Sequence, residues 1–159
     1  MTLDQSLACD IYCDLTKGLP FPDDSINMIY SSHVFEHFTY LEGQALLKES
    51  LRVLVPGGIF SIAVPNARLY IDSYLNDLAL DNPNFFRFKP AYNNTTRIDF
   101  VNYCAYMDGR HKYMFDEENL LFRLRESGFV DVGPRTFDEL LDREDRDHES
   151  LYAIAMKQR

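Results

Sequence analysis

The sequence has no tryptophan and few basic side chains among its 159 residues. Lysine and arginine total 16 against 25 aspartates and glutamates, which gives a formal net charge of -9 and excludes a strongly basic protein. The basic residues are scattered, so the chain lacks the basic patch that a nucleic-acid-binding surface requires. We therefore expect no nucleic-acid partner.

Long hydrophobic runs are also missing. No apolar stretch approaches the roughly 18 residues that span a bilayer, and the first residues lack the basic and apolar regions of a secretory signal. The three cysteines, Cys9, Cys13 and Cys104, lack the paired close spacing of a zinc site, so we expect reduced thiols. These absences predict a cytoplasmic protein with no membrane partner.

The length of 159 residues suits a single domain with one core. Inside it we distinguish a core at 13–66, a lid or insertion at 81–113, and a C-terminal helix and strand pair at 116–157. Each of these parts has its own hydrophobic pattern.

The core shows a strand, helix, strand pattern. An apolar run at Ile26–Tyr30 predicts a buried strand, and Ile59–Val64 predicts a second one. Between them, apolar residues recur at helical spacing from Tyr40 to Leu54, and Pro56-Gly57-Gly58 is expected to end that helix and turn the chain. Such a unit places its strands parallel in a Rossmann-like α/β sheet, with ligands at their carboxyl ends.

The rest of the chain is less regular. A weaker helical pattern runs from Ala67 to Leu80, and the aromatic-rich segment 81–113 is expected to be an irregular connection. Asp116 is a good N-cap for a helix that ends at Gly128. Strands at 129–137 and 151–156 then predict an antiparallel pair at the sheet edge, joined by a charged loop that we interpret as a solvated hairpin turn.

The order of these features resembles class I S-adenosylmethionine-dependent methyltransferases of the type 11 kind. The resemblance rests on Asp14-Leu15, the Leu-Pro-Phe-Pro-Asp turn, His33–His37, the Pro-Gly-Gly turn and Val64–Asn66. It covers about 13–66 well and continues more weakly to the final strands. It implies a truncated Rossmann-like methyltransferase fold, with a mostly parallel sheet and an antiparallel C-terminal hairpin.

The resemblance also implies S-adenosylmethionine as the cofactor and a role for each matching position. Asp14 would accept hydrogen bonds from the adenine amine, with Leu15 packed beside the ring. The methionine end of the cofactor would be lined by the loop after the next strand, which is Ser31, Ser32 and His33. The methyl acceptor, a small-molecule oxygen or nitrogen, would face Pro65 and Asn66.

Two candidate site residues, His111 and Asp14, have alternative roles that the residues leave open. His111 is the candidate catalytic base for the acceptor's proton, with Tyr113 beside it on the substrate side, because a histidine titrates near neutral pH. A hydrogen-bonded surface histidine is the other interpretation of His111. Asp14 could equally cap the turn Leu15–Lys17.

The N-terminal part of the family's sequence pattern is missing here. Only twelve residues precede Cys13, fewer than the roughly 30 of a βαβ unit, and Gly18 is the only glycine before Gly43. The glycine-rich cofactor turn is therefore absent from this pattern, and the alternative function is a degenerate, non-catalytic binding or assembly module. An uncovered strand edge at Ile26–Tyr30 also predicts a homo-oligomer.

The segment His33-x-x-Glu36-His37 matches the inverted zinc-protease motif. A protease site needs a third ligand and a motif well inside a helix, whereas this motif directly follows a predicted strand. Since the methyltransferase order explains the segment without a metal, we expect no metal ligand.

Overall fold

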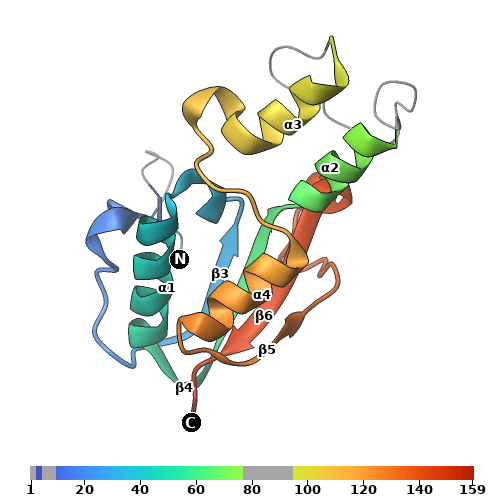
Figure 1. The fold of residues 1–159 in the computed structure, drawn as a ribbon. Coiled ribbons are helices and arrows are strands. Elements are labelled where there is room, and N and C mark those ends of the chain that lie inside the picture. The colour runs from blue at the N-terminus through green and yellow to red at the C-terminus, as the bar shows by residue number, and fades with distance from the viewer. Residues whose placement is uncertain (1–2, 5–9, 77–94) are drawn as a thin grey trace.

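The chain folds into a mixed α/β structure, which the computed structural model describes for residues 3–4, 10–76 and 95–159 (Figure 1). The strands are β1 Leu3–Asp4, β2 Ile11–Tyr12, β3 Ile26–Ser32, β4 Leu54–Pro65, β5 Val130–Pro134 and β6 Ser150–Met156. The α-helices are α1 Tyr40–Val53, α2 Ala67–Leu75, α3 Arg97–Tyr106 and α4 Glu117–Glu126. Across these described ranges, no helix has the length and apolar character to cross a membrane.

The unit β3–α1–β4 forms as the hydrophobic pattern predicts. α1 begins with a capping box, in which the Thr39 hydroxyl accepts a hydrogen bond from the Glu42 amide and the Glu42 carboxylate accepts one from the Thr39 amide. β3 and β4 pair in parallel, with Ser32 opposite Ala63. The carboxyl ends of both strands therefore lie at one edge of the sheet, where α/β folds bind ligands.

The C-terminal half adds α4 and an antiparallel strand pair, also as predicted. The Asp116 carboxylate accepts a hydrogen bond from the Asn119 amide at 2.8 Å, and Gly128, with a φ of +101°, ends α4. β6 pairs antiparallel with both β4 and β5, so the sheet order is β3-β4-β6-β5. β6 thus lies inside the sheet, and β5 alone of this pair is an edge strand in the described sheet.

One face of the sheet carries the main core, and α1 and α4 both cover it (Figure 1). Leu47 of α1 and Leu124 of α4 pack in the same cluster as Phe60 of β4. The apolar stripe of each helix is what drives this packing. Phe60 is fully buried, and its ring lies 6.0 Å from that of Phe35 and 5.3 Å from that of Phe129, centroid to centroid.

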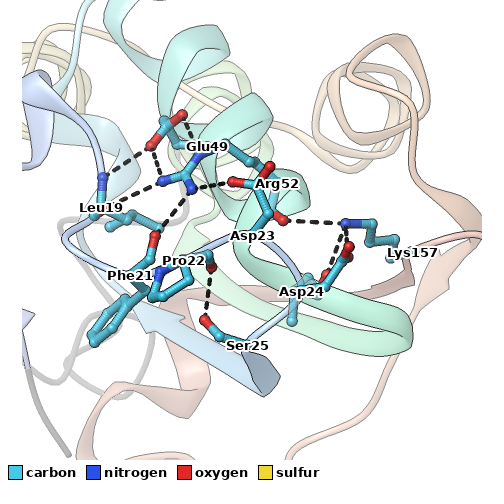
Figure 2. A network of polar contacts seen from close by, with 10 residues as sticks. Leu19, Phe21, Pro22, Asp23, Asp24, Ser25, Glu49, Arg52 and Lys157 are labelled. Atoms are coloured by element: carbon cyan, nitrogen blue, oxygen red, sulfur yellow. Dashed lines mark hydrogen bonds and ion pairs between the residues drawn. The ribbon is translucent and has the colours of Figure 1, made fainter.

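The turn that leads into β3 is fixed by two basic side chains, Arg52 and Lys157 (Figure 2). The Arg52 guanidinium donates hydrogen bonds to two carboxylates and two backbone carbonyls, those of Glu49, Asp23, Leu19 and Phe21. The Lys157 ammonium donates to the Asp24 carboxylate at 2.7 Å and to the Leu54 carbonyl at 2.8 Å. These bonds tie the turn to the end of α1 and to the C-terminal residues, so they fix the position of the turn beside β3.

Pro56-Gly57-Gly58 does not act as the predicted helix-ending turn. α1 ends at Val53 and β4 begins at once, so the three residues form an irregular stretch of β4 where its register with β3 shifts. Gly57 has a φ of +79°, and a side chain on Gly58 would lie 2.8 Å from the Val55 carbonyl oxygen. The glycines therefore allow the backbone to form a bulge within β4.

The segment 81–113 is not irregular throughout. Residues 77–94 lie outside the described residues, as does the end of the helix predicted to reach Leu80, but α3 occupies Arg97–Tyr106. Its first turn has a capping box, and it buries Phe100 and Cys104 against Ala67 and Tyr70 of α2. The prediction failed because the surface that stabilises α3 is another helix, distant from it in the sequence.

Candidate functional site

The carboxyl ends of β3 and β4 bring together several of the predicted site residues. Ser31 and Ser32 end β3, and the His33 amide continues the ladder by donating a hydrogen bond to the Ala63 carbonyl at 2.9 Å. Pro65 ends the neighbouring β4. Ser32 lines one cavity and His33 lines another, so two cavities adjoin at the end of β3.

The first of these, the β3 cavity, has a volume of about 410 Å³. Three of the five residues that the family resemblance assigns to the cofactor line it, namely Leu15, Ser31 and Ser32. Apolar side chains from β3, α1 and the preceding turn make up most of the rest of its wall. A mainly apolar wall with a few hydroxyl groups is typical of a small-molecule pocket.

Asp14 lines neither cavity. Its Oδ1 accepts hydrogen bonds from the Thr16 hydroxyl at 2.6 Å and the Thr16 amide at 3.1 Å, so Asp14 caps the 3-10 helix Leu15–Lys17. These bonds lower the pKa of Asp14 below its ordinary value. The capping alternative is therefore the arrangement seen here, and the adenine contact stays a prediction.

The second, the histidine cavity, has a volume of about 390 Å³ and gathers His33, His37 and His111, three of the four histidines in the chain. Pro65 and Glu36 also line it. Backbone hydrogen bonds join the distant segments, because the Glu36 carbonyl accepts from the amides that follow His111, at 2.7 and 3.2 Å. The predicted base therefore lies beside the end of β3.

His33 is a neutral, nearly buried imidazole. Its backbone has a φ of +51°, in the left-handed region, and its Nε2 lies 2.8 Å from the Ser150 Oγ. Its Nδ1 lies 3.7 Å from Oε1 of Glu36. Burial lowers the pKa of His33 to about 3, so this ring carries no charge at neutral pH.

Glu36 is the most unusual side chain in the cavity. The residue is 2% exposed, and among the described residues neither carboxylate oxygen has a hydrogen-bond partner. Burial raises the pKa of Glu36 to about 7. A buried carboxylate without hydrogen bonds destabilises the fold, which makes such a residue a candidate for function.

His37 and His111 are oriented by backbone carbonyls. Nδ1 of His37 lies 3.0 Å from the Arg110 oxygen, and Nδ1 of His111 lies 2.8 Å from the Cys104 oxygen. Since a carbonyl oxygen only accepts, Nδ1 carries a hydrogen in both rings, and the tautomer that this selects has its lone pair on Nε2. Burial also lowers the pKa of His111 below its ordinary value, so its base form is favoured.

The charged segment 142–149 is not merely a solvated hairpin turn. Its residues 144–149 form a 3-10 helix, and Arg143, Arg146 and Glu149 line the histidine cavity. The Tyr70 hydroxyl of α2 donates a hydrogen bond to the Glu149 carboxylate, which holds the segment against the site. Burial raises the pKa of Tyr70 above its ordinary value, so this phenol stays protonated.

Asn66 and Tyr113 lie outside both cavities. The Asn66 side chain accepts a hydrogen bond from the Leu69 amide at 3.3 Å and caps α2. The Tyr113 ring packs in the core, 6.2 Å from the Tyr40 ring and 4.9 Å from the Phe115 ring. The structure does not bring these two side chains to His111, and their acceptor-side roles stay predictions.

Several residues of the histidine cavity were not predicted as site residues, namely Glu36, His37, Tyr70, Cys104, Arg143, Arg146 and Glu149. Glu36 and His37 had a sequence signal in the zinc-protease motif, which we set aside. The others had none, because no pattern in the sequence shows that α2, α3 and the segment before β6 meet at one place.

The first part of the sequence matches a known domain family. A family model described as a methyltransferase domain matches residues 3–62. Among curated proteins, none matches this chain.

Solved methyltransferase structures share the fold. An S-adenosylmethionine-dependent methyltransferase from Archaeoglobus fulgidus is 18% identical with a TM-score of 0.56, over 92% of this chain and 66% of that one. One from Thermotoga maritima is 14% identical with a TM-score of 0.52, over 90% of this chain and 61% of that one. The methyltransferase SibL is 17% identical with a TM-score of 0.58, over 94% of this chain and 35% of that one. The chain thus spans less than two thirds of the length of each. Residues 3–62 match the model of the methyltransferase domain family, and the chain has the fold of class I S-adenosylmethionine-dependent methyltransferases.

Proposed function

We propose that the protein transfers a methyl group from S-adenosylmethionine to an oxygen or nitrogen of a small molecule. The observation that supports this most directly is the pair of cavities that adjoin at the end of β3. The β3 cavity would take the cofactor and the histidine cavity would take the acceptor. Ligands of α/β sheets bind at this edge, outside the carboxyl ends of the strands.

The residues of the β3 cavity fit the cofactor that the family uses. Leu15 offers an apolar surface for the adenine ring, and the hydroxyls of Ser31 and Ser32 are hydrogen-bonding groups for the methionine end. The volume of about 410 Å³ lies within the range of small-ligand pockets. Asp14 follows directly before Leu15 and would reach the adenine amine only by giving up part of its capping role.

The chemistry needs positioning and one proton acceptor. When bound, S-adenosylmethionine supplies a sulfonium methyl group, which an acceptor lone pair takes as the carbon–sulfur bond breaks and S-adenosylhomocysteine leaves. His111 would accept the proton that the acceptor loses, through its Nε2. The Cys104 carbonyl holds the ring in the tautomer that this role requires.

Calorimetry with S-adenosylhomocysteine tests the cofactor site. We expect binding in the micromolar range, and at least about tenfold weaker binding for Leu15→Glu, because a carboxylate would enter the apolar wall. Leu140→Glu is the matched control, since Leu140 is 93% exposed, and it should bind as the wild type does. The absence of heat at about 1 mM ligand with folded wild-type protein would contradict the proposal.

A second candidate function is that of a non-catalytic assembly module, favoured by the position of β3. Among the described strands β3 pairs only with β4, so its other side presents backbone hydrogen-bonding groups without a strand partner. Met28 on this strand is 42% exposed. Edge strands of this kind pair readily with a second chain, and we propose a homo-oligomer through β3.

Light scattering after size exclusion tests the assembly. We expect a mass of at least twice that of the chain, shifted toward the monomer by Met28→Lys, because a charged side chain on an edge strand opposes pairing. Met114→Lys, at a residue 37% exposed outside the strands, should leave the mass unchanged. A wild-type monomer at all concentrations would rule out this interface.

A further inference from the structure

Glu36 is buried, and its carboxylate has no hydrogen-bond partner among the described residues, which are properties of a side chain that binds a cation. Its residue is 2% exposed, and neither oxygen finds a hydrogen-bond donor among the described residues. Native buried carboxylates are normally paired, hydrogen-bonded or bound to a metal. Arg143 and Arg146 line the same cavity, yet neither forms an ion pair with Glu36 among the described residues.

Two imidazole nitrogens complete a set of ligand atoms around that carboxylate. One ligand atom from each of Glu36, His37 and His111 lies within 4.8 Å of the others. Nε2 of His37 is 3.9 Å from Oε1 of Glu36. Three donors at such mutual distances can bind one ion after small side-chain rotations, because metal–ligand bonds are about 2.0–2.2 Å long.

The outer contacts of both histidines are those of metal ligands. Each ring donates its Nδ1–H to a backbone carbonyl, His37 to Arg110 and His111 to Cys104. Ligating histidines almost always donate their second nitrogen in this way, which fixes the tautomer and the ring orientation. The loop that carries His111 is itself tied to Glu36, whose carbonyl accepts a hydrogen bond from the Lys112 amide at 2.7 Å.

We propose that Glu36, His37 and His111 bind a divalent transition-metal cation, with its remaining positions open to the histidine cavity. Two imidazoles and one carboxylate are the donor set of catalytic zinc sites and of non-haem iron sites. This differs from the inverted zinc-protease motif, because Glu36 would be a ligand and not the base, and because Glu36 and His37 lie on the short 3-10 turn Phe35–His37. The prediction that no residue binds metal is thereby revised.

The site would also select the acceptor, an inference that rests on the methyl transfer proposed above. A cation held by these residues would act as a Lewis acid on an acceptor hydroxyl and would lower the pKa of that hydroxyl. In the metal-loaded protein His111 would not act as the base proposed above, because its Nε2 lone pair would bind the metal, and the hydroxyl proton would pass to solvent. An oxygen acceptor is therefore favoured over a nitrogen acceptor in the metal-loaded protein.

Metal titration of the whole chain tests the site. The protein is purified without an affinity tag, stripped with a chelator and titrated with Zn²⁺ by calorimetry, and with Co²⁺ by visible absorption. We expect one site with a dissociation constant below about 1 μM. Glu36→Gln and His37→Asn should each weaken binding by more than about 100-fold and abolish the Co²⁺ bands. Neither readout involves the methyl donor, so failure to bind S-adenosylhomocysteine would leave this result standing.

Two controls separate a lost ligand from a lost fold. Glu36→Gln keeps the side-chain volume and removes a buried charge, so the metal-free variant should melt at the same or a higher temperature than the metal-free wild type. His148→Asn changes the one histidine that does not line the histidine cavity and should bind Zn²⁺ as the wild type does. No binding at about 100 μM Zn²⁺, or equal binding by Glu36→Gln, would overturn the proposal.

Discussion

Replacing Phe60 by alanine is expected to lower the free energy of unfolding by about 3–5 kcal/mol. Phe60 is fully buried in β4, between the two helices that cover the sheet. Its ring meets Phe35 edge-on at a centroid distance of 6.0 Å and Phe129 at 5.3 Å. Truncation leaves a cavity whose walls include α1 and α4 and cannot all relax inward. Urea unfolding followed by circular dichroism measures the loss.

The size of this effect matters because small domains have a total stability of about 5–15 kcal/mol. The Phe60→Ala variant is therefore expected to be marginally folded. Phe122→Ala is the matched control, since Phe122 is 54% exposed on α4, and it should change stability by less than about 0.5 kcal/mol. A loss below about 1 kcal/mol for Phe60→Ala would show that this cluster is not the main core.

Replacing Asp142 by alanine is expected to cost about 3–5 kcal/mol. The Asp142 side chain is 1% exposed and accepts hydrogen bonds from Arg135 at 2.7 Å and from the Tyr30 hydroxyl at 2.9 Å. Arg135 also donates to the Ser61 hydroxyl at 2.9 Å, on the sheet face opposite the helices. Loss of the carboxylate leaves the Arg135 guanidinium, 12% exposed, without its counter-ion.

The same pair predicts a loss of stability in acid. Burial alone would raise the pKa of Asp142, but hydrogen bonds from Arg135, the Asp138 amide and Tyr30 hold it below the ordinary value of 3.8. A lowered native pKa stabilises the fold above pH 3.8, and this contribution disappears as the pH falls through the native value. Unfolding curves between neutrality and about pH 2 should show this loss for the wild type and lack it for Asp142→Ala.

Two further variants identify the cause. Asp72→Ala removes an exposed ion pair with Arg68 on α2 and should cost no more than about 0.5 kcal/mol. Changing both members of the buried pair, Arg135→Met with Asp142→Leu, should recover part of the stability that Asp142→Ala loses, because no unpaired charge remains. If the double variant is as unstable as the single one, packing rather than the unpaired charge explains the loss.

Short-range patterns were enough to predict β3, α1, β4 and α4. Each of these elements is marked by its own apolar periodicity and by residues at its ends, as Asp116 and Gly128 mark α4. The same kind of pattern missed α3, whose buried residues Phe100 and Cys104 face a single helix. It predicted the antiparallel pair at the sheet edge but not that β6 also pairs with β4, because a strand's sequence does not show how many neighbours it has.

The sequence by itself determined the α/β class, the strand–helix–strand unit and the presence of polar residues at the carboxyl end of β3. Only the tertiary structure decided which distant residues join them. It placed His111 beside Glu36 and His37, put Asp14 in a cap, and left Tyr113 in the core. The physical reason is the range of the interactions: periodicity and capping act within a few residues, whereas a site is closed by packing and by backbone hydrogen bonds such as that from Lys112 to Glu36.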